Sequence, residues 1–124
     1  MDKKTKILVV DDQPEVCEVI RLVLKDKYSI VTAGGAEEAF RYLADNPVRL
    51  VLLDIKMPKV DGITVLEQIK EKHPGTEVIV VTAYATIEIM RRAIKLGACG
   101  FLMKPFDIDV LINTVDAALK GTEE

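Results

Sequence analysis

The amino-acid sequence predicts an α/β domain in which helices cover both faces of a five-stranded parallel sheet. Short apolar runs alternate with amphipathic helical patterns five times along the chain, and this alternation is typical of parallel strands joined by right-handed crossovers. The chain has 124 residues, of which 49% are hydrophobic and 30% are charged. This length and composition suit one globular domain over residues 1–124.

Four of the five predicted strands are continuously apolar. Strands buried on both faces of a parallel sheet need no alternation of polar and apolar residues, and four runs fit this description: Ile7–Val10, Leu50–Leu53, Val78–Val81 and Phe101–Met103. The fifth strand, Tyr28–Ala33, has mixed polarity. We therefore expect it at an edge of the sheet.

Five helical patterns separate and follow these strands, and they cover about Val16–Val23, Ala36–Ala44, Ile63–Lys72, Ile87–Leu96 and Asp107–Leu119. Pro14 suits the first turn of the first helix, and Gly97 ends the fourth. Asp107 is a candidate N-cap of the last helix. His73 is expected where the third helix ends and receives no role. A linker would begin near Gly121.

Polar residues stand at the carboxyl ends of four predicted strands. Asp11 and Asp12 follow the first strand and Asp54 the third, while Thr82 follows the fourth and Lys104 the fifth. The order of elements fits a flavodoxin-like (βα)5 fold with strand order 2-1-3-4-5, in which ligands bind beyond the carboxyl ends of the strands. We therefore expect three carboxylates, one hydroxyl and one ammonium to converge at one edge of the sheet.

Such a cluster needs positive charge, because each close pair of carboxylates costs about 4 kcal/mol at an effective dielectric constant near 20. Lys104 supplies one charge, and a pocket of oxygen ligands without sulfur or imidazole matches Mg²⁺. With its charge screened by a cation, a carboxylate becomes a nucleophile toward a phosphoryl group. Asp54 is the central candidate, and Thr82 and Lys104 would contact the phosphoryl oxygens.

Composition argues against several other functions. The formal net charge of -3 gives no reason to expect direct nucleic-acid binding. The first apolar run is too short for a signal peptide or a membrane span, so we expect a cytoplasmic protein without membrane contacts. Cys17 and Cys99 lack the spacing of a zinc or redox pair, and we expect both to be buried, reduced thiols.

These motifs resemble the receiver domains of bacterial two-component response regulators, from Ile7 to Leu119. The resemblance rests on Ile7-Leu-Val-Val-Asp-Asp-Gln13, on Leu52-Leu-Asp-Ile-Lys-Met-Pro58 followed by Asp61-Gly62, on Val81-Thr-Ala83 and on Phe101-Leu-Met-Lys-Pro-Phe106. It implies a phosphoprotein of signal transduction or a phosphorelay, which takes a phosphoryl group from a sensor histidine kinase or a phosphotransfer protein and catalyses only its own phosphorylation and dephosphorylation.

The resemblance also implies a role for each site residue. Asp54 would be the phosphoacceptor, and Mg²⁺ would be held by Asp11, Asp12, Asp54 and the main-chain carbonyl of Lys56. Thr82 would be the switch hydroxyl and Lys104 the partner of the phosphate, aimed inward by a cis Lys104–Pro105 bond. Phe101 matches the switch aromatic. Since it lacks the hydroxyl of the commoner tyrosine, its inward conformation is favoured even before phosphorylation.

Partner surfaces follow from the same resemblance. The kinase would dock on the first helix and the loop after the fifth strand, at Gln13, Pro14, Val16, Pro105 and Phe106. Phosphorylation would change the surface formed by the fourth helix, fifth strand and fifth helix. Relatives use that surface for dimers or output contacts, and a homodimer through it stays open.

Two further expectations concern the pocket. The segment from Met57-Pro58 to Asp61-Gly62 should form a loop over it, with Gly62 easing the turn into the third helix. Lys56 and Tyr84 occupy positions that border the hydrolytic water in the family. We expect their bulk to slow dephosphorylation by crowding that water.

Three rival interpretations compete with this one. A flavin site fails because Asp11-Asp12-Gln13-Pro14 would repel the flavin phosphate. An aspartate-nucleophile phosphatase carries Asp-x-Asp at its first strand, whereas the pair here is adjacent. The third interpretation is a receiver fold that serves only as a protein-binding module and is never phosphorylated. Whether the domain stands alone or belongs to a longer regulator stays open.

Overall fold

The sheet has the strand order that the sequence predicts. The computed structural model describes residues 4–120, so the linker predicted from Gly121 lies outside the described residues. Five parallel strands pair in the order β2-β1-β3-β6-β7. Their bounds are β1 Lys6–Val10, β2 Ser29–Ala33, β3 Leu50–Leu53, β6 Glu77–Thr82 and β7 Gly100–Met103. The mixed-polarity strand β2 lies at one edge, as predicted, and β7 forms the other.

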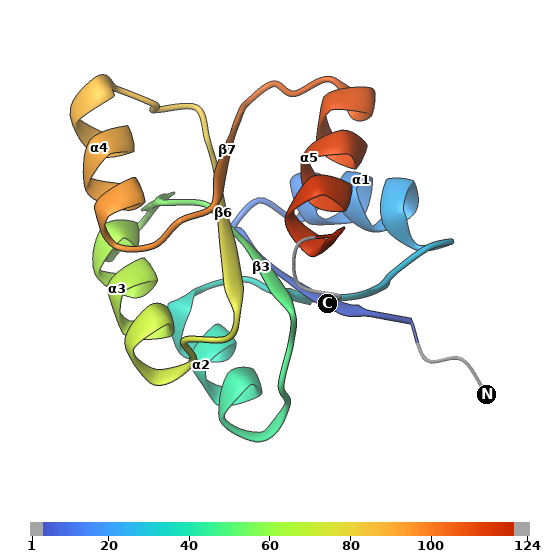
Figure 1. Cartoon of the computed structure of the whole chain (residues 1–124), viewed down its shortest axis with the longest axis horizontal. Helices are drawn as coiled ribbons and strands as arrows, with labels where there is room; N and C mark the ends of the chain where they lie inside the picture. The colour runs from blue at the N-terminus through green and yellow to red at the C-terminus, as the bar shows by residue number, and fades with distance from the viewer. Residues whose placement is uncertain (1–3, 121–124) are drawn as a thin grey trace.

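Helices cover both faces of this sheet. Figure 1 shows α1 and α5 together on one face and α2, α3 and α4 on the other. The helices are α1 Pro14–Leu24, α2 Ala36–Asp45, α3 Gly62–Lys72, α4 Ile87–Lys95 and α5 Ile108–Lys120. Each agrees with the predicted helix to within about two residues at most ends. Among the described helices, none combines the length and apolar character needed to cross a membrane.

The continuous apolar runs are explained by two hydrophobic clusters, one on each face. Alternate residues of β1 divide between them: Leu8 and Val10 pack toward α2, α3 and α4, and Ile7 and Val9 pack toward α1 and α5. All four side chains are at most 1% exposed. A central strand that buries both of its faces in this way has no position for a polar side chain until it ends.

Cys17 is buried on α1, as predicted, but the prediction that Cys99 is buried is wrong, because its residue is exposed. Cys99 lies directly before β7, and its main-chain amide donates to the carbonyl of Val78 at 2.8 Å. Since β7 is an edge strand, no further strand covers this position. The predicted strand order already put this strand at an edge, but the prediction for Cys99 rested on its apolar sequence context alone.

The segment after β3 contains a short antiparallel hairpin, β4 Lys56–Met57 and β5 Val60–Asp61, where the sequence predicted only a loop. Lys59 at its turn has φ 72°. Gly62 follows, and a Cβ built there would lie 2.1 Å from the Cα of Ile55. Glycine is therefore required at this position by close backbone approach, which locks the hairpin and the start of α3 to the segment that follows β3.

We predict that Gly62→Ala lowers the free energy of unfolding by about 1 to 3 kcal/mol, because the backbone at Ile55 has to shift. The measurement is urea denaturation. Gly75→Ala is the matched control, since a Cβ at Gly75 meets nothing within 4 Å, and it should change stability by no more than about 1 kcal/mol. Equal stability of the two variants would contradict the close-approach explanation.

Candidate metal centre at the edge of the sheet

Backbone hydrogen bonds continue one residue beyond the strands and fix the polar residues that follow them. The amide of Asp11 donates to the carbonyl of Ala33 at 3.1 Å, and that of Asp54 donates to Val10 at 3.0 Å. The amide of Lys104 donates to Thr82 at 3.0 Å. The parallel register of the sheet therefore brings these residues to one edge, as the sequence predicts.

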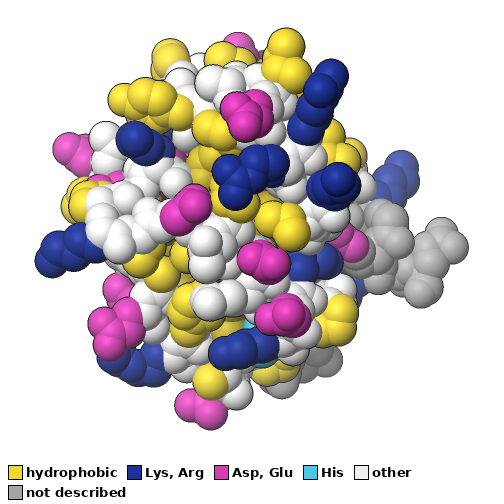
Figure 2. Space-filling model, turned by 90° about the vertical axis from the view of Figure 1, so that its left-hand side faces the viewer, with side chains coloured by type: hydrophobic (Ala, Val, Ile, Leu, Met, Phe, Trp, Pro, Cys, Tyr) yellow, Lys and Arg dark blue, Asp and Glu magenta, His cyan; other side chains and the backbone are white. Residues whose placement is uncertain are grey.

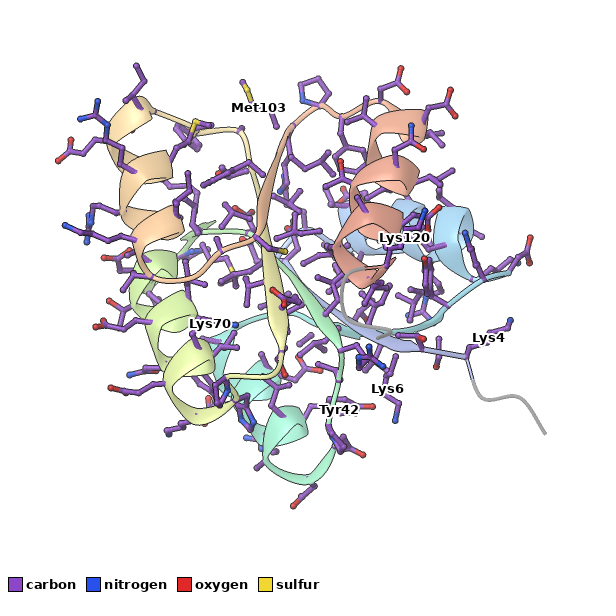
Figure 3. The ribbon with its side chains drawn as sticks, in the orientation of Figure 1. Lys4, Lys6, Tyr42, Lys70, Met103 and Lys120 are labelled. Carbon is purple, nitrogen blue, oxygen red and sulfur yellow. The ribbon has the colours of Figure 1, made fainter. Side chains whose placement is uncertain are left out.

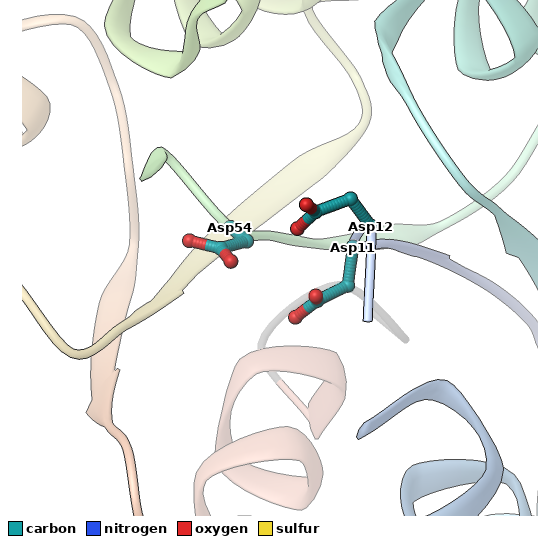
Figure 4. Close-up of side chains that lie close together, drawn as sticks. All are labelled: Asp11, Asp12 and Asp54. Carbon is teal, nitrogen blue, oxygen red and sulfur yellow. The ribbon is translucent and has the colours of Figure 1, made fainter. Parts of the chain in front are cut away.

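Three carboxylates meet at this edge. One side-chain oxygen from each of Asp11, Asp12 and Asp54 lies within 4.8 Å of the other two, and Figure 4 shows the side chains from the ends of β1 and β3 gathered around a common space. Asp11 and Asp54 are 3% and 4% exposed, whereas Asp12 is exposed. Buried carboxylates so close together repel one another unless cations balance them.

Lys104 lies between two of these carboxylates. Its Nζ is 2.7 Å from Oδ2 of Asp11 and 2.9 Å from Oδ2 of Asp54, and it donates a further hydrogen bond to Oε1 of Gln13 at 3.0 Å. Each of the three N–H bonds of the ammonium therefore has an acceptor. The Lys104–Pro105 peptide bond is cis, as predicted.

The pKa values of Asp11 and Lys104 are shifted both by burial and by hydrogen bonds. Burial raises the pKa of Asp11, and the hydrogen bonds from Lys104 and from the amide of Gln13 offset that effect only in part. Burial lowers the pKa of Lys104, but its hydrogen bonds to Asp11 and Asp54 outweigh burial and leave the pKa raised. Lys104 is therefore charged at neutral pH.

Main-chain amides orient the carboxylates. The amide of Lys56 donates to Oδ1 of Asp54 at 2.9 Å, and the amide of Gln13 donates to Oδ1 of Asp11 at 2.9 Å. Asp54 is thus held by an amide on one oxygen and by Lys104 on the other. These contacts fix the direction in which its side chain faces the pocket.

The donor set fits a divalent cation. Asp11, Asp12 and Asp54 supply only oxygen ligands, which suit hard cations such as Mg²⁺. Within the cluster, Lys104 balances one of three negative charges, so two remain for a cation to balance. The side-chain oxygens lie close enough for one ion to contact all three residues.

The two predicted switch residues lie on the neighbouring strands β6 and β7. Thr82 is 1% exposed, and its Oγ1 accepts from the amide of Tyr84 at 3.1 Å. The hydroxyl keeps its own proton for another acceptor. Phe101, which pairs with Val80 across the two strands, is half-buried and packs against the cluster on the face of α3 and α4.

An open pocket of about 610 Å³ lies above the carboxylates. Its lining comes from the loops after β1, β3, β6 and β7: Asp12, Gln13, Asp54, Lys56, Met57, Pro58, Ala83, Tyr84 and Lys104. The Nζ of Lys56 lies 5.1 Å from the centre of the Tyr84 ring, within the range of a cation–π contact. The two bulky residues singled out from the sequence therefore lie against each other at the pocket.

The sequence did not predict the contact between Gln13 and Lys104 or the pairing of Lys56 with Tyr84. Both contacts join loops that are far apart in sequence. The available signal was positional, because Gln13, Lys56 and Tyr84 each lie within two positions of a site residue at the end of a strand. Strand ends place residues near a site, but they do not specify which side chains touch.

We predict that Asp11→Asn raises the melting temperature of the metal-free protein at pH 7. Because the folded protein binds the Asp11 proton more tightly than the unfolded chain does, stability falls as the pH rises through the raised pKa. Asparagine removes that cost, and Lys104 keeps Asp54 and Gln13 as acceptors. In thermal denaturation, the gain in melting temperature should shrink as the pH is lowered. A variant less stable than the parent at pH 7 would contradict this explanation.

Comparisons with known proteins agree with this geometry. Residues 7–116 match the model of the response regulator receiver domain. The chain is 36% identical over 117 residues to the transcriptional regulatory protein ZraR of Escherichia coli, and 35% identical over 118 residues to the response regulator protein PilR of Pseudomonas aeruginosa. Each alignment covers 94% of this chain but 26% of the relative, so the chain spans about a quarter of their length.

Solved structures show the same fold over nearly the whole of this chain. A receiver domain protein from Methanospirillum hungatei has a TM-score of 0.93 and 29% identity, with 98% of each chain covered. NtrX from Brucella abortus has a TM-score of 0.90 and 34% identity, with 97% of this chain and 28% of that chain covered. The fold, the acidic edge and the family match agree, and this chain belongs to the response regulator receiver domain family.

Proposed function

We propose that the domain is a phosphorylation-dependent signalling switch in which Asp54 accepts a phosphoryl group from a histidine kinase or a phosphotransfer protein. The observation that carries this proposal is the position of Asp54. It lies in a cluster with Asp11 and Asp12, contacts Lys104 at 2.9 Å and lines the open pocket. No other described carboxylate combines these three properties.

The reaction forms one bond and breaks one. A carboxylate oxygen of Asp54 attacks the phosphorus, and the bond from phosphorus to the donor's histidine nitrogen breaks, leaving its electron pair on the imidazole. Lys104 and the Thr82 hydroxyl would stabilise the charge on the phosphoryl oxygens. Mg²⁺, held by Asp11, Asp12, Asp54 and the carbonyl of Lys56, would screen the acceptor from the incoming oxygens.

Asp54 suits the role of acceptor better than its two neighbours. Asp11 does not line the pocket. Asp12 lines the pocket but is exposed. Asp54 is buried, oriented by the amide of Lys56, and still reaches the pocket. Its environment favours one defined direction of attack.

A groove beside the pocket supports docking of a phosphodonor. It has a volume of about 470 Å³ and runs between α1 and the loop after β7, lined by Gln13, Glu15, Val16, Val19, Ala83, Lys104, Pro105 and Phe106. Gln13, Ala83 and Lys104 also line the acidic pocket. A partner seated in this apolar groove would have its reactive histidine next to Asp54.

A target of the domain would recognise the phosphorylated state at the surface of α4, β7 and α5. The Thr82 hydroxyl is bonded to the amide of Tyr84, so a movement of Thr82 toward a phosphoryl group would pull on the segment that leads into α4. Exposed apolar residues are available there: Ile87 and Ile94 on α4 and Met103 on β7. Figure 3 shows Met103 at the outer edge of the molecule.

The face seen in Figure 2, on the side of α3 and α4, mixes hydrophobic side chains with charged side chains of both signs. On α4, Arg91, Arg92 and Lys95 line a hollow together with Ile87 and Glu88. Exposed ion pairs add only about 0 to 1 kcal/mol each, so a homodimer or a target contact through this surface would depend on the apolar residues.

The central prediction is that incubation with Mg²⁺ and acetyl phosphate adds one phosphoryl group, and that Asp54→Asn abolishes the addition. Mass spectrometry of the intact protein measures it. Asp45→Asn is the matched control, because Asp45 is an exposed residue at the end of α2, and it should still be phosphorylated. No adduct on the parent protein would favour an unphosphorylated binding module. Turnover of unrelated phosphoesters would favour a phosphatase.

A second prediction concerns the lifetime of the phosphoryl group. Lys56→Ala and Tyr84→Ala should each shorten it several-fold, because the paired side chains crowd the water that would attack phosphorus. Loss of phosphate from the isolated phosphoprotein is the readout. If the residues act as a pair, the double variant should resemble either single variant.

The control is Lys72→Ala, which removes a similar contact between Lys72 and the Phe40 ring, 5.9 Å apart and away from the pocket. It should leave the lifetime unchanged. Lifetimes equal to that of the parent in both pocket variants would show that the pair does not limit access of water.

A further inference from the structure

The side chain of Gln13 is bonded to Lys104 at the mouth of the pocket. Its Oε1 accepts from Nζ at 3.0 Å, across 91 positions of sequence. Gln13 is the N-cap residue of α1, yet its side chain makes no capping hydrogen bond. Ser, Thr, Asp and Asn normally fill that role. The Gln13 side chain therefore binds Lys104 and does not cap the helix.

The three acceptors of Lys104 differ in what else they have to do. Asp11 and Asp54 accept from it at 2.7 and 2.9 Å, but the proposed function needs Asp11 for the cation and Asp54 for the phosphoryl group. The Gln13 side chain is needed neither for the cation nor for the phosphoryl group. Its amide oxygen is also uncharged, so it holds the ammonium without neutralising it.

The backbone of Gln13 adds a second constraint at the same point. Its amide donates to Oδ1 of Asp11 at 2.9 Å, and Pro14 follows at the first position of α1, where its ring restricts the backbone. One residue therefore fixes both a carboxylate of the cluster and the cation that faces it. The Gln13 side chain cannot move far without breaking its bond to Lys104.

We propose that Gln13 is a positioning residue, whose amide oxygen holds the Lys104 ammonium at the mouth of the pocket, where phosphoryl oxygens would arrive. This inference rests on the proposed function. Without this acceptor, the Lys104 ammonium would settle on Asp11 and Asp54 alone. It would then lie deeper, and its charge would be directed at the nucleophile and not at the phosphoryl group.

The test compares Gln13→Met, which has similar length but no acceptor, with Gln13→Glu, which keeps one. Gln68→Met is the matched control, because Gln68 is exposed on α3. Two quantities are measured in each: the ¹H–¹⁵N NMR signal of the Lys104 ammonium in the metal-free protein, and the rate of phosphorylation by acetyl phosphate with Mg²⁺. Because acetyl phosphate is a small donor, this rate does not depend on any effect of Gln13 on the docking of a partner protein.

We expect Gln13→Met to shift or broaden the Lys104 signal and to slow phosphorylation about fivefold, the scale of one ordinary hydrogen bond, because the bond to Lys104 is exposed to water. Gln13→Glu should retain the signal, and Gln68→Met should match the parent in both measurements. An unchanged Lys104 signal in Gln13→Met overturns the proposal, whether or not the rate falls. If the parent takes up no phosphate, the proposed function fails, but the Lys104 signal still decides the role of Gln13.

Discussion

Three carboxylates and one ammonium share the edge of the sheet, and the balance of charge among them governs the rest of the site. Lys104 bridges Asp11 and Asp54 at 2.7 and 2.9 Å, which offsets part of their repulsion but leaves an excess of negative charge. The fold stabilises this arrangement through backbone bonds that extend past the strands. A cation bound at that edge would relieve the remaining repulsion and would thereby stabilise the folded domain.

The same constraint links the site to its surroundings. The pocket, the apolar groove and the start of the segment leading into α4 share residues or hydrogen bonds. Ala83 lies between the pocket and the groove, and Tyr84 donates its amide to Thr82 while its ring contacts Lys56. A change of charge at Asp54 would therefore act on Lys104, which lines both the pocket and the apolar groove, and on Thr82, which is bonded to the segment that leads into α4.

Most of the fold could be predicted because its signals are local. Continuous apolar runs, helical spacing and helix-ending residues identified five strands and five helices, and parallel pairing then required Asp11, Asp54 and Lys104 to meet. The hairpin at Lys56–Asp61 could not be predicted, because its strands have two residues each. The exposure of Cys99 follows from its place directly before the edge strand β7, and its apolar sequence context gave no sign of it. The bond from Gln13 to Lys104 depends on side-chain conformation, which spacing does not encode.

A crystal structure of the domain with Mg²⁺ and beryllofluoride, a phosphoryl mimic, is the most direct test of Asp54 as the phosphoacceptor. We expect a cation contacted by Asp11, Asp12 and Asp54, with beryllium bonded to Asp54 and with Lys104 and Thr82 contacting fluorine atoms. Lys104 should then have left Oδ2 of Asp11, from which it now lies 2.7 Å. A structure in which Lys104 still bridges Asp11 and Asp54, with neither a cation nor an adduct in the cluster, would contradict it.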